Sequence, residues 1–446
     1  MSIRWRSMLW VMAALMAASL VCAAPDLAAK EDAKLDEETG TSKVQAPREA
    51  PPIGYRGPEA EERFFFHVDG GAFYTLSDDA EEGSLSGFDF MATVAPTYRI
   101  KPRTFASLVY DGRYYKRREL YSDDAGFRTR EEHQEHTLTP ILRYDFGPNS
   151  RYSLKPFAFY TRTYNKDTDD SDWDDGLYNY EDVGAGTDFK VRELAFAGAD
   201  NGIWTIGAQL YKRRYPNYES LLDLAGEPGI EEDEKDYTGL ILRSSYEWLN
   251  QTGFSWSLEY SLLYKWLEDK KIVNSNGVLT DEEQEDAFHT LDLKAWYFFG
   301  EDFRLGLDLM AMLKDSDQNY YDALDTLNIA DDVFIDDYYD YFLYRVEPNV
   351  SYTFALFPLT VYGSVAYERS DYDERLAQFP DQTYKDDEQW EEQKILKAGL
   401  SYALNDNFSL VTEYEHTNYD SNNEDESVYQ YNYWVDVFSA GLRFRF

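Results

Sequence analysis

Apolar and polar side chains alternate with a period of two along this chain, from Arg63 to the last residue. In the stretch 254–266, aromatic residues and Leu fill the even positions, whereas Ser, Glu and Lys fill most of the odd positions. Successive side chains of a β-strand point to opposite faces, so each such segment presents one apolar face and one polar face. The pattern predicts an all-β chain whose strands separate an apolar medium from a polar one.

The connections between these segments alternate between short and long. The short ones are rich in Gly, Pro, Asn and Asp, which favour turns. They fall at 101–103, 147–150, 198–202, 250–253, 300–302, 357–358 and 405–407. Long polar stretches such as 165–175, 213–236 and 314–337 lie between them. Short turns at one end and long loops at the other are typical of transmembrane antiparallel β-barrels. Seven turns join eight hairpins, so we predict about sixteen strands with both termini in the periplasm.

The composition agrees with a barrel better than with a water-soluble core. Aromatic residues make up 17% of the chain, with 38 Tyr, and the formal net charge is −41. Tyr combines an apolar ring with a polar hydroxyl, which suits the boundary between lipid and water. A soluble β-sandwich or propeller also alternates, but its strands are usually shorter and its apolar face packs on a second sheet.

The N-terminal residues predict export. Arg4 and Arg6 precede an apolar stretch at 8–21, and small residues follow it, so residues 1–23 have the form of a cleaved signal peptide. The alternatives are an uncleaved anchor, for which the apolar stretch is short, and lipidation at Cys22, the single cysteine. A lipobox would need Leu and Gly or Ala where this chain has Ser19 and Val21.

Residues 24–61 are polar and rich in Pro, with no sustained periodicity. This composition predicts a flexible, disordered periplasmic linker. The barrel is then expected to span residues 62–446.

The last strand has Phe438, Leu442, Phe444 and Phe446 on one face, and the chain stops on an aromatic residue. This ending resembles the C-terminal signature of bacterial, porin-like outer-membrane β-barrel proteins, although it identifies no specific family. The resemblance implies a location in the Gram-negative cell outer membrane and insertion by the barrel-assembly machinery after transport by periplasmic chaperones. Outer-membrane lipids and lipopolysaccharide are the expected surroundings.

Most of the acidic residues fall in predicted external loops rather than on predicted inward strand positions. The dense acidic runs are 78–82, 167–175, 231–236, 281–286, 331–340 and 386–392. The inward strand positions carry both signs of charge. The candidate lumen charges are Arg99, Arg143, Lys190, Arg243, Glu259, Lys265, Asp292, Lys294, Arg304, Asp308, Arg345 and Glu347. A mixed-charge lumen with an acidic external rim is therefore predicted.

Three functions fit these features. The preferred hypothesis is a porin-like channel for small hydrophilic solutes, because sixteen strands enclose a water-filled interior. The alternatives are an exporter or assembly barrel for a surface polysaccharide or surface protein, and a structural or adhesive barrel acting through its loops. In the last case, acidic loops such as 167–172 could bridge Ca²⁺ or Mg²⁺, although solvated, mutually repelling loops are the commoner outcome.

No cofactor and no enzymatic activity are predicted. The five histidines, at positions 67, 133, 136, 289 and 416, have no recognisable nucleophile or metal motif nearby. A chain this acidic would repel phosphate, so nucleic acid is not an expected partner. The sequence leaves the oligomeric state open.

Overall fold

The structure is a computed structural model of the 446-residue chain. It describes residues 63–79, 83–119, 130–166, 172–196, 199–218, 233–249, 253–322, 332–425 and 432–446. The predicted signal peptide (1–23) and linker (24–61) lie outside the described residues. Among the described residues, no helix is long and apolar enough to cross a membrane.

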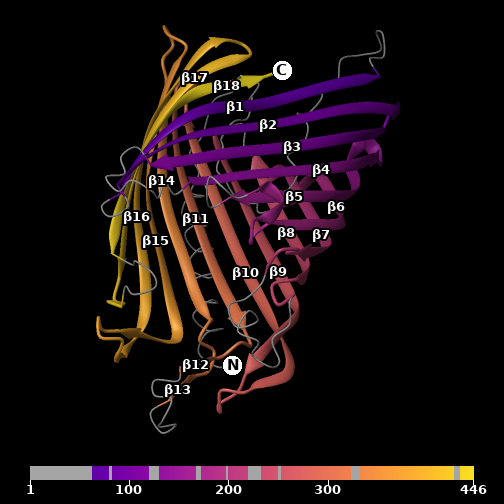
Figure 1. Cartoon of the computed structure of the whole chain (residues 1–446). Coiled ribbons are helices and arrows are strands. Elements are labelled where there is room, and N and C mark those ends of the chain that lie inside the picture. The colour runs from indigo at the N-terminus through magenta and orange to yellow at the C-terminus, as the bar shows by residue number, and fades with distance from the viewer. Residues whose placement is uncertain are drawn as a thin grey trace. The chain divides into compact units, whose positions relative to one another are not determined.

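Sixteen antiparallel strands close into one barrel, which confirms the predicted fold class and strand count. Each strand pairs with its neighbours in chain order, and β18 lies beside β1 (Figure 1). The barrel strands are β1 (Phe64–Asp79), β2 (Gly83–Lys101), β3 (Thr104–Glu119), β4 (Arg130–Phe146), β5 (Tyr152–Lys166), β6 (Tyr180–Phe196), β7 (Ala199–Arg214), β8 (Tyr237–Leu249), β9 (Phe254–Val273), β10 (Leu279–Phe299), β11 (Phe303–Ser316), β14 (Tyr341–Thr353), β15 (Leu359–Gln378), β16 (Tyr384–Asn405), β17 (Phe408–Ser421) and β18 (Tyr433–Arg445).

Four short elements lie outside the barrel sheet. The strands β12 (Tyr320–Asp322) and β13 (Val333–Ile335) pair with each other between β11 and β14. The other two are single 3₁₀ turns, η1 (Pro148–Ser150) and η2 (Trp173–Asp175). The expectation of a loop over 314–337 is therefore wrong in part, because β11 continues to Ser316 and a small hairpin follows it.

The barrel closes between the first and last strands. Ala72 lies opposite Leu442, and Leu76 lies opposite Phe438. The backbone amide of Val68 donates to the carbonyl of Phe446 at 2.9 Å, and the amide of Phe446 donates to the carbonyl of Val68 at 2.7 Å. The last residue of the chain is therefore part of the seam that closes the sheet.

The two faces of the sheet differ as the alternation requires. On β2 the large side chains of Phe88, Phe90 and Tyr98 are exposed, whereas Ala95 and Thr97, at alternate positions, are about 5% exposed. The tyrosine ring of Tyr362 covers Gly399 on the neighbouring strand, and a Cβ at that glycine would overlap the ring. Such covering of strand glycines by cross-strand aromatic rings helps to fix the register of a sheet.

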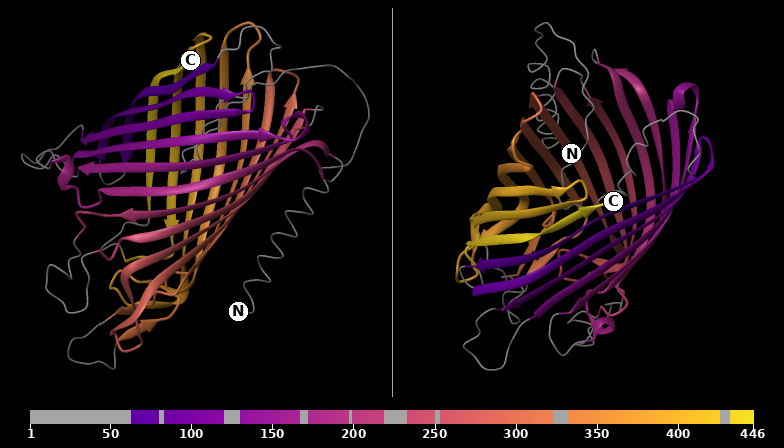
Figure 2. Two further views of the ribbon diagram at one scale, coloured as in Figure 1. Left: turned by 90° about the vertical axis from the view of Figure 1, so that its right-hand side faces the viewer. Right: turned by 90° about the horizontal axis from the view of Figure 1, so that it is seen from above.

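The two ends of the barrel differ in the length of their connections. The β2–β3, β4–β5, β6–β7, β8–β9, β10–β11, β14–β15 and β16–β17 connections are all at the end where β1 begins and β18 finishes. The strands are strongly tilted, and those of the two halves of the barrel cross in projection (Figure 2). We refer to the end with the short turns as the turn end and to the other as the loop end.

Two predicted loop runs belong to strands. The acidic run 281–286 lies on β10, and the run 386–392 lies on β16. These strands have 21 and 22 residues, about twice the ~10 needed to cross a membrane. The strands therefore continue beyond an apolar belt, and their acidic ends form much of the rim at the loop end.

Exposed aromatic side chains gather at two levels of the outer face. Those nearer the turn end are Phe64, Phe66, Tyr98, Tyr144, Tyr297, Phe299, Tyr352, Tyr402 and Phe446. Those nearer the loop end include Tyr74, Phe88 and Tyr160. On β2 the two levels are ten residues apart, from Phe88 to Tyr98. At about 3.4 Å per residue and a tilt of about 40°, this separation spans about 26 Å, close to the apolar band of an outer-membrane barrel.

Candidate functional site: the inner wall of the barrel

The register places the twelve candidate lumen charges on the face opposite to the exposed apolar side chains. Lys294 lies across from Asp308, which in turn lies across from Glu347. Glu259 lies across from Asp292. The four candidates on β2–β8 (Arg99, Arg143, Lys190 and Arg243) are all cationic. The eight on β9–β14 (Glu259, Lys265, Asp292, Lys294, Arg304, Asp308, Arg345 and Glu347) carry four charges of each sign.

One cluster on this wall is built around Asp188 of β6. Its carboxylate forms an ion pair with Lys155 of β5 at 3.2 Å and a second one with Arg243 of β8. The side chain of Asp188 is 8% exposed, and that of Lys155 is 13% exposed. Two cations thus share one carboxylate on the inner wall, and the set joins β5, β6 and β8 across the intervening β7.

A second cluster lies near the turn end. Arg143 donates two hydrogen bonds to Asp145, at 3.0 and 2.8 Å, and Arg192 lies 3.9 Å from the same carboxylate. The Arg99 guanidinium lies between the rings of Phe65 and Phe105, at 5.4 and 5.7 Å from their centroids. Cationic side chains therefore outnumber acids on this part of the wall.

A third cluster spans β14 to β17. Arg345 forms an ion pair with Glu347 and lies 3.7 Å from Glu368. The Ser364 hydroxyl donates to Glu347 at 2.8 Å. Lys397 pairs with Glu415 at 2.6 Å. These contacts join adjacent strands by alternating charges.

Asp308 and Arg304 of β11 differ from these paired groups. Asp308 Oδ1 and Arg304 Nε are buried, and neither has a hydrogen-bond partner among the residues that the structure describes. A polar group buried without a partner is costly unless water reaches it. These two atoms are therefore polar groups of the inner wall that the described residues leave without a hydrogen bond.

Aromatic rings and cations alternate on the inner wall near the loop end. Arg213 of β7 donates two hydrogen bonds of 2.7 Å to Asp182, and its guanidinium lies 3.8 Å from the ring centroid of Tyr180. The ammonium group of Lys265 lies over the rings of Tyr237 and Phe288, at 5.0 and 4.8 Å. Cation–π contact of this kind stabilises charge next to apolar surface.

The connection between β7 and β8 also packs closely where it is described. The backbone amide of Tyr215 donates to Asp236 Oδ1 at 2.7 Å, yet burial raises the pKa of the Asp236 carboxyl above its ordinary value. Lys235 lies between the rings of Tyr178 and Tyr218, at 4.6 and 4.4 Å. Burial lowers the pKa of this lysine and, with Glu234 next to it, raises the pKa of Tyr218 to about 12. These contacts join the described ends of this connection to each other and to Tyr178.

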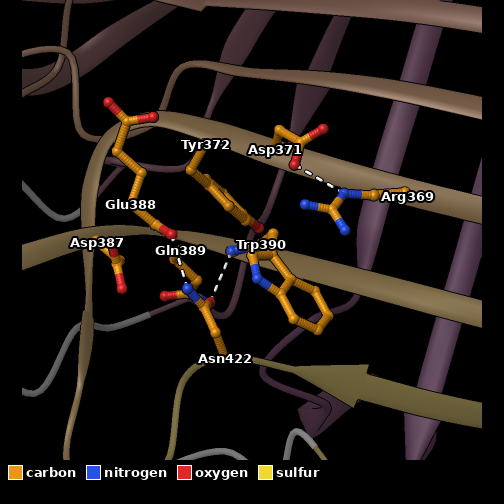
Figure 3. Close-up of a pocket in the computed structure, with 8 residues that line it drawn as sticks. All are labelled: Arg369, Asp371, Tyr372, Asp387, Glu388, Gln389, Trp390 and Asn422. Carbon is orange, nitrogen blue, oxygen red and sulfur yellow. Dashed lines mark hydrogen bonds and ion pairs between the residues drawn. The ribbon is translucent and has the colours of Figure 1, made fainter. Parts of the chain in front are cut away.

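A polar pocket of about 370 Å³ lies where the pairing of β15 and β16 shifts register. Figure 3 shows the Asn422 side chain between the two backbone groups that it bonds. Its amide nitrogen donates to the carbonyl of Glu388 at 2.8 Å, and its oxygen accepts from the amide of Trp390 at 2.9 Å. The side chain thus continues the ladder between β16 and β17, so the polar groups of this pocket have a structural role.

Four histidines have polar partners across the sheet. His136 contacts the Tyr110 hydroxyl and His289 contacts the Tyr260 hydroxyl, both at 2.8 Å. His133 contacts Asn165 at 2.7 Å, and His416 contacts Asp436 at 2.8 Å. These pairings tie neighbouring strands together.

No group of three or more His, Cys, Asp or Glu side chains in the described part of the chain is arranged to hold a metal ion. The acidic stretch 167–171, which the cation-bridging hypothesis uses, lies outside the described residues.

Sequence reasoning missed several charged residues of the inner wall. Lys155, Glu368 and Glu415 occupy inward positions on their strands and form the ion pairs described above. Their strand parity alone could have identified them. Lys314, at the start of the polar connection expected over 314–337, lies on β11 opposite Phe288.

No protein-family model matches this chain, and no curated protein matches it. Solved structures with a similar barrel include the outer membrane protein OmpT of Vibrio cholerae in a trimer form, with 11% identity and a TM-score of 0.39 over 86% of this chain and 100% of that one. A triple mutant of the Rhodopseudomonas blastica porin has 12% identity and a TM-score of 0.33 over 86% of this chain and 100% of that one. A bacterial polysaccharide outer membrane secretin has 10% identity and a TM-score of 0.40 over 85% of this chain and 98% of that one. Similarity at this level assigns neither family nor function, and the fold is established by the strand pairing itself.

Proposed function

We propose that this protein is a barrel of the Gram-negative outer membrane and forms a channel for small hydrophilic solutes. The short turns face the periplasm in this proposal, and the acidic loop end faces outward. Membrane lipids and lipopolysaccharide contact the apolar belt, and the barrel-assembly machinery inserts the chain after periplasmic chaperones deliver it. Cleavage of the signal peptide precedes these steps.

The observation that carries this proposal is the charged inner wall. Sixteen strands about 4.8 Å apart, tilted by about 40°, enclose a backbone cylinder about 30 Å across. Side chains do not fill a barrel of this size, which usually holds an aqueous channel. Paired charges such as Lys155 and Asp188 on the inner face, and exposed apolar side chains on the outer face, suit water inside and lipid outside.

The inner wall also bears on selectivity. The candidates on β2–β8 are all cationic, with Arg143 and Arg243 paired to Asp145 and Asp188, and those on β9–β14 carry both signs in equal number. A wet wall on which both signs of charge alternate can interact with polar solutes of either charge. The acidic rim raises the local concentration of cations at the mouth.

The test is reconstitution of the purified barrel in planar lipid bilayers. The proposal predicts discrete steps of conductance with a modest preference for cations, which weakens as salt screens the acidic rim. A variant that lacks residues 219–232 serves as a control for obstruction of the lumen by that segment. If neither the intact nor the shortened barrel conducts, the channel function is wrong.

A further inference from the structure

Two lysines near the loop end lie on either side of one aromatic ring of the inner wall. Lys265 of β9 and Lys314 of β11 lie on the strands that flank β10, which carries Phe288. Their ammonium groups are 4.8 and 5.7 Å from the Phe288 ring centroid. Lys265 also lies over Tyr237 at 5.0 Å, and Lys314 lies over Tyr339 at 5.3 Å. We call Lys265, Phe288 and Lys314 the lysine–phenyl step.

The lysines of the step differ from the ion-paired lysines of the inner wall. Lys155 and Lys397 each have a carboxylate within 3.2 Å. Among the described residues, the ammonium groups of Lys265 and Lys314 contact aromatic rings and have no hydrogen-bond acceptor or ion-pair partner. Both lysines are only partly exposed.

The acids nearest to the two lysines attract them without forming an ion pair, since the charge of Asp286 acts on both lysines and that of Asp340 acts on Lys314. Asp286 lies directly opposite Lys265, but it is 7% exposed and accepts a hydrogen bond from Gln284 at 2.9 Å. Asp340, beyond Lys314, accepts the backbone amide of Ser316 at 2.7 Å. These carboxylates are held by their own partners and form no ion pair with either lysine.

A partly desolvated ammonium group that meets only rings retains unused hydrogen-bond donors. An oxyanion supplies the acceptors that the rings lack, and a charge-assisted bond to it is among the stronger hydrogen bonds. The phenyl ring between the two cations offers an apolar surface next to that oxyanion. The arrangement therefore suits a solute that joins an oxyanion to a ring.

We infer that the lysine–phenyl step binds small organic oxyanions, carboxylates or phosphates attached to a ring, as they enter the channel. The oxyanion lies between the two ammonium groups, and the ring of the solute packs on Phe288. The part that this site plays in solute passage rests on the proposed channel function. Binding itself can be measured whether or not the barrel conducts. It gives the channel a local preference for anions behind an acidic rim.

The test uses the refolded full barrel in detergent micelles, with benzoate and phenyl phosphate as probes and neutral benzyl alcohol as the comparison. Saturation-transfer NMR titrations measure binding to the wild type and to a Lys265→Gln/Lys314→Gln variant. The matched control is Lys212→Gln/Lys394→Gln, because those lysines pair with Glu268 and with Glu392 elsewhere on strands of the loop end. Both variants lose two positive charges, and thermal unfolding checks that each is folded.

The inference predicts that one or both acids bind the wild type more tightly than benzyl alcohol does. It predicts a loss of about tenfold or more in Lys265→Gln/Lys314→Gln, since two charge-assisted hydrogen bonds disappear, and little loss in the control. Comparison of benzoate with phenyl phosphate tells which oxyanion the step prefers. The inference is overturned if benzyl alcohol binds the wild type as tightly as both acids do. It is also overturned if the control variant loses as much affinity as Lys265→Gln/Lys314→Gln.

The same preparations are then placed in planar bilayers. If the barrel conducts but neither probe binds, the binding role of the lysine–phenyl step is wrong and the channel function stands. Binding without conductance would reject the channel and leave the step as a ligand site. With both present, benzoate should interrupt the wild-type current more often than that of the Lys265→Gln/Lys314→Gln variant.

Discussion

Replacing Asp188 by Asn tests whether the ion pairs of the inner wall stabilise the barrel. Its carboxylate is 8% exposed and pairs with Lys155 at 3.2 Å and with Arg243. At an effective dielectric constant of about 20, two unit charges 3.2 Å apart interact by about 5 kcal/mol. Desolvation offsets much of this attraction, but Asp188→Asn leaves two cations without their partner. We therefore expect a loss of about 3 kcal/mol in the free energy of unfolding.

The assay is equilibrium unfolding in urea of the barrel refolded in lipid vesicles, followed by tryptophan fluorescence. Asp308→Asn is the matched comparison, because it also removes one inner-wall carboxylate charge. Asp308 has a buried oxygen without a hydrogen-bond partner among the described residues, and it lies across from Glu347. Its loss should change stability by no more than about 1 kcal/mol.

The reasoning fails if Asp188→Asn unfolds at the wild-type urea concentration, or if Asp308→Asn is destabilised by as much. The first result would mean that water in the lumen screens the pairs completely. The second would mean that any inner-wall charge matters equally, whatever its contacts.

Three further predictions concern the seam, the packing and the external rim. Phe446→Ser should reduce the amount of folded barrel in outer-membrane fractions several-fold, because it removes the ring that packs on Phe408 beside the seam; unchanged yield and unchanged heat-modifiable mobility would contradict this. Gly399→Val should destabilise the barrel by about 1–3 kcal/mol through overlap with the Tyr362 ring, and adding Tyr362→Ala should restore part of the loss in urea unfolding. Burial raises the pKa of the Asp236 carboxyl above its ordinary 3.8, so the folded state binds this proton more tightly than the unfolded state. The stability that this bound proton contributes is fully present below pH 3.8 and is lost as the pH rises through the raised pKa. The free energy of unfolding of Asp236→Asn, minus that of the wild type, should therefore be larger at about pH 7 than at about pH 3. The same difference at the two pH values would contradict this.

The barrel could be predicted from the sequence because its determinants are local. Alternation in segments such as 254–266 assigns each residue to a face, and the turn residues at 300–302 and 405–407 mark where the chain reverses. Even parity then follows from counting the turns. None of these steps needs knowledge of contacts between distant residues.

The ends of the strands and the contacts of the inner wall could not be predicted in the same way. The acidic runs 281–286 and 386–392 look like loops, because charge is the usual mark of a solvated loop. They are strands because β10 and β16 continue to pair with their neighbours beyond the apolar belt. The sharing of Asp188 between Lys155 and Arg243 depends on the register of four strands, which alternation leaves undetermined.

Single cysteines along β9 test the central claim, a lipid-facing outer wall around a water-filled channel, most directly. The chain has one cysteine, Cys22, within the predicted signal peptide, so an introduced thiol would be unique after cleavage. The measurement is the current through bilayer-reconstituted barrels while a charged, membrane-impermeant thiol reagent is added. Ser257→Cys and Ser261→Cys should react and change the conductance, whereas Leu258→Cys and Leu262→Cys should not. Reaction at all four positions, or at the two leucine positions alone, would contradict the account.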